Sequence, residues 1–173
     1  MKVKTQIFVD KYVAKPVAYL LNFLARLVGQ LLRIDHSLDR DFERIAICKF
    51  KGMGSILQST PMLHSIRNRY PEAEIIYVST QGNRAMLEKI DWVDTIVTVD
   101  DRSLRAFVRT NIHALLFLIR KRPQIYFDLE IYSDYSTLFT LFTLSVNRVG
   151  FYLRSSSFRM GIYTQMMFFN PRV

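Results

Sequence analysis

Short apolar runs alternate with helical stretches from residue 44 onward, and this alternation limits the fold more than any other feature of the sequence. Four of the runs are expected to be strands, namely 44–50, 74–79, 94–99 and 124–131. Helices are predicted between them at 56–70, 82–90 and 103–122, and a helix at 133–145 and a short strand at 147–151 follow. The order predicts an α/β protein with a Rossmann-like parallel sheet, helices on both faces and right-handed crossovers.

Pro61 lies inside the first predicted helix, at 56–70. Proline has no backbone N–H, and its ring clashes with the preceding turn of a helix. The helix therefore either kinks at Pro61 or begins there, with Thr60 as its N-cap.

The N-terminal region, residues 1–40, is expected to be an amphipathic helix that precedes the α/β domain at 41–173. Its apolar run from Val17 to Leu32 contains Arg26 and has sixteen residues, whereas a spanning helix needs roughly 20. Polar side chains recur at helical spacing, at Lys15, Tyr19, Asn22, Arg26, Gln30 and Arg33, and leucines form another face, at Leu20, Leu24, Leu27 and Leu31. The pattern favours a helix lying in a membrane interface, with packing on its own domain or on a partner as the alternative.

The charge of the chain favours an acidic partner. It has 24 Lys and Arg against 15 Asp and Glu, a net charge of +9. Anionic lipid, a phosphorylated glycolipid and nucleic acid all suit that charge, but no nucleic-acid-binding motif accompanies it, so nucleic acid is not expected. Cys48 is the only cysteine and the three histidines are scattered, so no disulfide, metal site or cofactor is expected, and a cytoplasmic location fits best.

The turn at 49–55, KFKGMGS, follows the first predicted strand, at the edge where parallel sheets bind ligands. It lacks the third glycine of a dinucleotide fingerprint and contains no P-loop. Its N–H groups, with Lys49 and Lys51, can still hold an anionic group. Alternatively, Gly52 and Gly54 only permit positive φ and Ser55 only caps the following helix.

The stretch from Ile45 to Asp100 resembles the N-terminal half of glycosyltransferase family 9, the heptosyltransferase-like enzymes of lipopolysaccharide biosynthesis. In that family a first strand leads into a glycine-containing turn, a helix with an internal T-x-P, and then R-x-x-x-P-x-A-x-I before the second strand. The matching residues here are Thr60, Pro61, Arg67, Pro71, Ala73 and Ile75. YFDLEIYSDYSTL and NRVGFYLRS extend the resemblance to about residues 44–170, and the amphipathic start is similar to leaders of some members.

The resemblance implies the GT-B architecture, in which two Rossmann-like domains face each other across a cleft. The N-terminal domain receives a lipid-linked acceptor and the C-terminal domain holds a nucleotide sugar, often ADP-heptose. Transfer inverts the anomeric carbon without a bound metal, and a carboxylate in the first turn acts as general base. By this resemblance the chain is the acceptor-side half of a glycosyltransferase, peripheral at the inner face of the plasma membrane, with a separate donor-binding domain as a partner.

The sequence departs from the family at two points. Family members usually carry an aspartate directly after the second glycine of the turn, where this chain has Ser55, and a positioned base supplies about 10²- to 10⁴-fold in rate. The candidates to replace this aspartate as the base are Glu130 and Asp134. Asp128 is a third candidate, or else it only caps a turn or pairs with a basic residue of the α/β domain. The chain also ends at Val173, where the donor-binding domain of the family begins, so it is expected to be truncated and inactive alone. The alternative function is a non-catalytic α/β module that docks on a membrane or on a partner.

Overall fold

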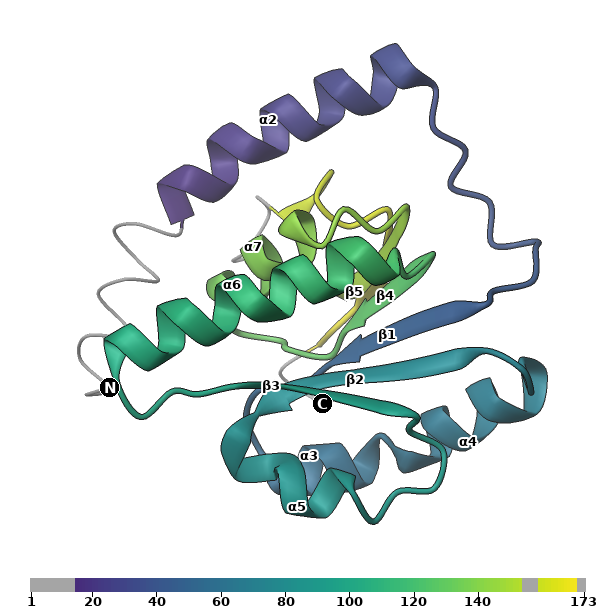
Figure 1. Cartoon of the computed structure of the whole chain (residues 1–173). Helices are drawn as coiled ribbons and strands as arrows, with labels where there is room; N and C mark the ends of the chain where they lie inside the picture. The colour runs from purple at the N-terminus through teal and green to yellow at the C-terminus, as the bar shows by residue number, and fades with distance from the viewer. Residues whose placement is uncertain (1–14, 154–158, 171–173) are drawn as a thin grey trace.

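The structure, a computed structural model, describes residues 15–153 and 159–170 and contains a six-stranded parallel sheet (Figure 1). The strands are β1 (Arg44–Cys48), β2 (Glu74–Thr80), β3 (Thr95–Val99), β4 (Ile125–Asp128), β5 (Asn147–Tyr152) and β6 (Gln165–Phe168). Their order is β3-β2-β1-β4-β5-β6, and all five pairings are parallel. This is the doubly wound order of Rossmann folds and confirms the predicted α/β class.

Helices cover both faces of the sheet. One face carries α3 (Met53–Gln58), α4 (Thr60–Arg69) and α5 (Arg84–Leu87), and the other carries α6 (Leu104–Lys121) and α7 (Asp134–Phe142) (Figure 1). The helix after β1 and the helix after β4 therefore lie on opposite faces, although β1 and β4 are neighbours. The winding direction reverses between these two strands, which is where ligands bind in open α/β sheets.

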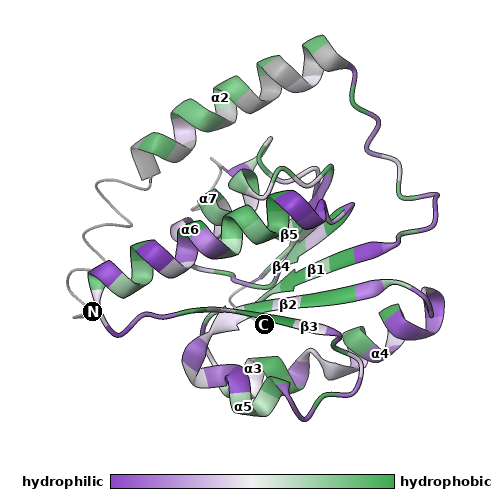
Figure 2. Cartoon of the chain, in the orientation of Figure 1, coloured by the Kyte–Doolittle hydropathy of each residue, from purple (hydrophilic) through white to green (hydrophobic). Residues whose placement is uncertain are grey.

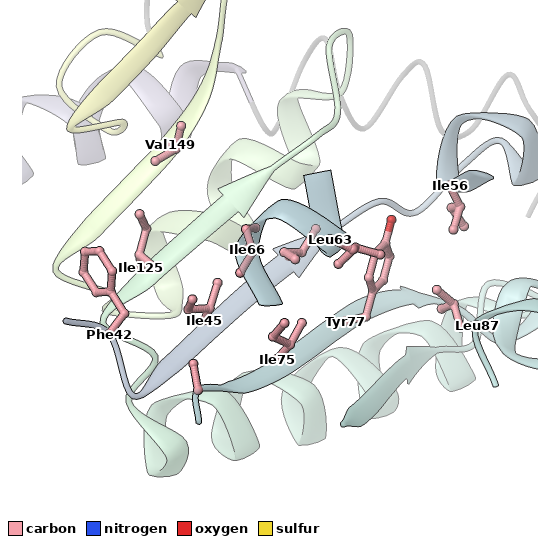
Figure 3. Packing of buried hydrophobic residues seen from close by; sticks show 12 residues of the cluster. Phe42, Ile45, Ile56, Leu63, Ile66, Ile75, Tyr77, Leu87, Ile125 and Val149 are labelled. Atoms are coloured by element: carbon pink, nitrogen blue, oxygen red, sulfur yellow. The ribbon is translucent and has the colours of Figure 1, made fainter. Parts of the chain in front are cut away.

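The central strands are apolar on both faces. Ile45 and Ile75 pack under α4, with Leu63 and Ile66 above them (Figure 3). On the other face the core includes the strand and helix residues Ala46, Cys48, Ile76, Val78, Ala114, Leu118 and Phe139. Because successive side chains of a strand point to opposite faces, a strand covered on both sides must be apolar throughout.

The predicted helix at 56–70 is two helices that meet at Ser59. The Ser59 hydroxyl donates to the Ile56 carbonyl at 2.7 Å, and the Leu63 N–H donates to the Ser59 carbonyl at 3.0 Å. Pro61 lies in the first turn of α4, where an N–H has no helical partner. The alternative in which proline marks a new start is therefore confirmed, with Ser59 rather than Thr60 as N-cap.

Two further segments differ from the prediction. The helix expected at 82–90 is shorter, a 3₁₀ turn η2 (Gln81–Asn83) followed by α5. The Asn83 amide in the 3₁₀ turn donates to the Phe50 carbonyl, just after β1, and to the Ser79 hydroxyl in β2. Strand β6 was not predicted. Its sequence, QMMF, contains methionines in place of the β-branched residues that favour strands.

The predicted amphipathic helix is present as α2 (Lys15–Leu32), on the same side of the sheet as α6 and α7 (Figure 1). Leu20, Leu27 and Leu31 are exposed, and apolar residues recur along the helix (Figure 2). A hollow of about 740 Å³ lies between α2 and the body, lined by residues that include Leu21 and Phe142. Among the described residues, no helix is both long and apolar enough to span a bilayer. Residues 1–14 lie outside the described part of the chain.

Candidate functional site

The predicted site residues come from the two segments that follow β1 and β4, beside the reversal of the winding direction. Residues 49–55 leave β1, and residues 129–134 leave β4. The segments meet where the Leu129 N–H donates to the Cys48 carbonyl at 2.9 Å. The structure thus brings Lys49 and its turn beside Glu130.

The Glu130 carboxylate holds the turn from the β4 side. Its Oε1 accepts the N–H groups of Phe50 and Lys51 at 2.9 and 2.8 Å. Its Oε2 lies 3.3 Å from the Lys49 ammonium, which also donates to the Leu129 carbonyl at 3.1 Å. The Lys49 and Glu130 side chains are only 10% and 9% exposed. We call this arrangement the Glu130 clamp, and it binds two of the N–H groups and one of the lysines that were predicted to meet an anionic ligand.

The end of β2 holds the same turn from the other side. The Ser79 hydroxyl donates to the Lys49 carbonyl at 2.5 Å, and the Asn83 amide donates to the Phe50 carbonyl at 3.1 Å. The Thr80 hydroxyl donates to the Phe50 carbonyl as well, at 3.1 Å. The sequence analysis did not predict these three residues as part of the site. Their partners are 30 or more positions away along the chain, and local sequence patterns do not indicate contacts over that separation.

The exposed part of the turn runs from residue 51 to residue 55 and includes Lys51, Gly52, Gly54 and Ser55. Gly52 has φ of 87°, a left-handed conformation, and a Cβ there would lie 3.1 Å from the Ser55 hydroxyl. Gly54 has open space around the position of its missing Cβ. Ser55 is the third residue of α3, whose N-cap, Gly52, makes no side-chain cap bond. The positive φ therefore explains Gly52 but not Gly54, and the side chain at 55 faces solvent.

Asp128 is buried and caps the chain reversal after β4. Its Oδ1 accepts the Glu130 N–H at 2.9 Å, and its Oδ2 accepts the hydroxyls of Tyr163 at 2.6 Å and Thr140 at 3.1 Å. Burial raises the pKa of Asp128, although the hydrogen bonds from Tyr163 and the Glu130 N–H oppose that rise. Of the roles considered from the sequence, the turn cap is the one that this geometry matches.

Asp134 begins α7, behind the N-cap Ser133, whose hydroxyl accepts the Ser136 N–H at 3.2 Å. Its carboxylate lies 4.0 Å from the guanidinium of Arg159, a fully buried side chain that donates to the Ser133 carbonyl at 3.0 Å. The sequence did not indicate a role for Arg159, because nothing in the local sequence distinguishes an arginine that is buried from one that is exposed. Among the described residues, no group of three or more His, Cys, Asp or Glu side chains is placed to hold a metal ion.

These features define the class of the chain as a Rossmann-like domain with a glycine turn at its switch point. No protein-family model and no curated protein sequence matches the chain. Among solved structures it is similar to a family 9 glycosyltransferase from Veillonella parvula, with a TM-score of 0.64 and 15% identity over 76% of this chain and 37% of that one.

Two Escherichia coli structures are similar as well. ADP-heptose lipopolysaccharide heptosyltransferase II matches with a TM-score of 0.60 and 19% identity, over 75% of this chain and 36% of that one. The heptosyltransferase WaaC, solved with ADP, matches with a TM-score of 0.62 and 16% identity, over 75% and 43%. The chain spans less than half the length of each of these proteins. The predicted resemblance is thus confirmed at the level of the fold, which is that of family 9 glycosyltransferases and heptosyltransferases.

Proposed function

We propose that this chain is the acceptor-side half of a family 9 glycosyltransferase, which transfers a heptose-like sugar to a lipopolysaccharide-core or similar glycolipid. The observation that carries the proposal is the glycine turn at the β1–β4 switch point of a sheet with the heptosyltransferase fold. The acceptor hydroxyl attacks the anomeric carbon of the sugar, the nucleoside diphosphate leaves, and the hydroxyl proton passes to a base. The donor sugar requires a second domain, so the chain alone is inactive in this proposal.

The contacts of each residue suggest its role. Lys51 and the backbone at Gly52 and Gly54 face solvent and are proposed to meet the acceptor. Both oxygens of Glu130 are engaged in the Glu130 clamp, so Glu130 serves as a positioning residue rather than as the base. Asp134 is the better candidate base, because its side chain is 18% exposed against 9% for Glu130.

A fusion of the chain to the donor-binding domain of a family 9 enzyme tests this proposal. With a nucleotide sugar and a glycolipid acceptor, we expect weak transfer by the wild-type fusion and none by the chain alone. Ser55→Asp should raise turnover about ten-fold or more, within the range that a positioned base supplies. Aspartate fits the exposed first turn of α3, where negative charge is favourable.

Asp134→Asn and Glu130→Gln complete the series. Loss of turnover in Asp134→Asn would assign the base to Asp134. Loss in Glu130→Gln with unchanged stability would move the base to Glu130. Full wild-type turnover that none of the three substitutions alters would show that the turn at 49–55 is only structural.

Peripheral attachment at the cytoplasmic face of the plasma membrane is part of the proposal. It is supported by the exposed apolar residues of α2, among them Phe23 and Leu31, and by the net charge of +9. A glycolipid acceptor lies in such a surface, so attachment would hold the switch point near its substrate.

A second candidate function is a non-catalytic module that docks on a membrane or on a partner. Ser55 favours this module, because it places a hydroxyl at the exposed position where the family carries its base. Glu130 does not replace that base, since its carboxylate accepts the N–H groups of the turn. A donor-binding Rossmann domain encoded next to the gene would favour the enzyme over this module.

A further inference from the structure

α6 carries an unpartnered apolar stripe on its outer side. Ala114 and Leu118 face the sheet and are buried, whereas a second row of apolar side chains is exposed. This row, which we call the α6 stripe, consists of Leu104, Val108, Ile112, Leu116 and Ile119. Steps of three and four residues place the row along one side of a helix. A continuous exposed apolar surface of this kind marks an interaction site.

Basic side chains border the α6 stripe. Arg105, Arg109 and Arg120 each follow a stripe residue directly, so they form a parallel row, and all three are exposed. The 18 residues of α6 include no acidic residue. Within the described part of the chain, neither Arg105 nor Arg109 makes an ion pair. Apolar and hydrophilic segments accordingly alternate along α6 in Figure 2.

We propose that the α6 stripe is a membrane contact, which inserts into the interface of an anionic phospholipid bilayer while Arg105 and Arg109 bind the headgroups. An interfacial helix needs an apolar face with basic residues at its margin, and α6 has both. A second copy of the chain fits poorly. A two-fold contact through α6 would bring the arginine rows of both copies together, with no carboxylate on the helix to neutralise them.

This inference goes beyond the proposed function, which assigns membrane attachment to α2. Both helices lie on the same side of the sheet, and α2 leaves the α6 stripe exposed (Figure 1). Two contacts fix an orientation that one helix leaves open. Because α6 begins just after the carboxyl end of β3, its first turn lies at the edge of the sheet that also carries the turn at 49–55.

A fluorescent probe on the α6 stripe tests the proposal directly in the full chain. Leu116→Cys allows labelling with an environment-sensitive fluorophore, since Cys48, the only native cysteine, is buried. We expect blue-shifted emission with phosphatidylglycerol vesicles, and little shift with pure phosphatidylcholine vesicles or at high salt. Leu57→Cys is the matched control, because Leu57 lies on α3 at the opposite face and is 58% exposed against 59% for Leu116. Its probe should not shift.

Charged variants provide the second measurement. Ile112→Glu with Leu116→Glu should weaken binding to phosphatidylglycerol vesicles about ten-fold or more, as expected when inserted apolar side chains are lost. Their urea unfolding should match wild type, and Leu57→Glu should leave vesicle binding unchanged. If the chain binds vesicles while the Leu116 probe stays in water, attachment is through α2 alone and the proposal is wrong. A shift that depends on protein concentration without vesicles would assign the α6 stripe to a second copy and also overturn it.

Discussion

Removing the Glu130 carboxylate should destabilise the whole domain. In Glu130→Ala, the buried Lys49 ammonium loses its counter-charge, and the N–H groups of Phe50 and Lys51 lose the oxygen that lies 2.9 and 2.8 Å away. Breaking one partner out of a buried ion pair costs about 3–5 kcal/mol. Unsatisfied N–H groups cost about 1–3 kcal/mol each, but the contacts of one side chain are not additive, so these costs are not summed with that of the ion pair.

We therefore expect Glu130→Ala to lower the free energy of unfolding by about 3–5 kcal/mol, a large share of the total for a domain of this size. Urea denaturation followed by far-UV circular dichroism and by the single tryptophan, Trp92, measures the loss. Glu88→Ala is the control. Its exposed ion pair with Arg84, at 2.8 Å, should contribute about 0.5 kcal/mol or less.

A double-mutant cycle isolates the ion pair from the rest of the clamp. Lys49→Met and Glu130→Gln should each destabilise, and the double variant should recover about 1–3 kcal/mol relative to the sum of the two. A loss in Glu130→Ala no larger than that of Glu88→Ala would refute the clamp. It would also restore Glu130 as a candidate base, since its carboxylate would then have no structural task.

Three further outcomes follow from the contacts described. Because burial raises the pKa of Asp128, the folded state keeps a proton that the unfolded state has released, so wild type should lose stability relative to Asp128→Asn as pH rises above about 4; parallel stability–pH profiles would contradict this. Gly150→Ala should lower the free energy of unfolding by about 1–3 kcal/mol, since its Cβ would lie 2.6 Å from the ring of Tyr163, whose hydroxyl donates to Asp128. Gly54→Ala is the control and should cost little, because the space around the missing Cβ is open. Phe23→Glu with Leu31→Glu should reduce flotation of the chain with anionic liposomes, and equal flotation would argue against attachment through α2.

The parts of the fold that were predictable are those in which local pattern and tertiary environment agree. Strand β1 is apolar at every position after Arg44 because helices cover both of its faces, and α6 begins where Ser103 accepts the Ala106 N–H. The break between α3 and α4 was anticipated from Pro61, but its position at Ser59 was not, because the local sequence left both a kink and a new start at residue 61 open. The edge strand β6 was missed because three of its four residues are exposed, and an exposed edge needs no apolar alternation.

The position of the candidate site was predictable from the sequence, but the contacts between its side chains were not. Glycines after a buried strand indicated the turn, and Gly52 does adopt positive φ. That Lys49 faces Glu130 and not solvent depends on β1 pairing with β4, about 80 positions along the chain. Sequence spacing carries no information on such a contact, so the same lysine was an equally good candidate for a phosphate ligand.

The turn at 49–55 is held by side chains that belong to other segments. Its conformation therefore does not depend on the side chain at position 55. Glu130 holds its N–H groups, Ser79 and Asn83 hold its carbonyls, and the Ser55 side chain points to solvent. A substitution at 55 can therefore exchange a hydroxyl for a carboxylate without refolding the loop that carries it. In evolutionary terms, a change in one codon at position 55 can alter the chemical group that this loop presents to solvent, while the scaffold retains its shape.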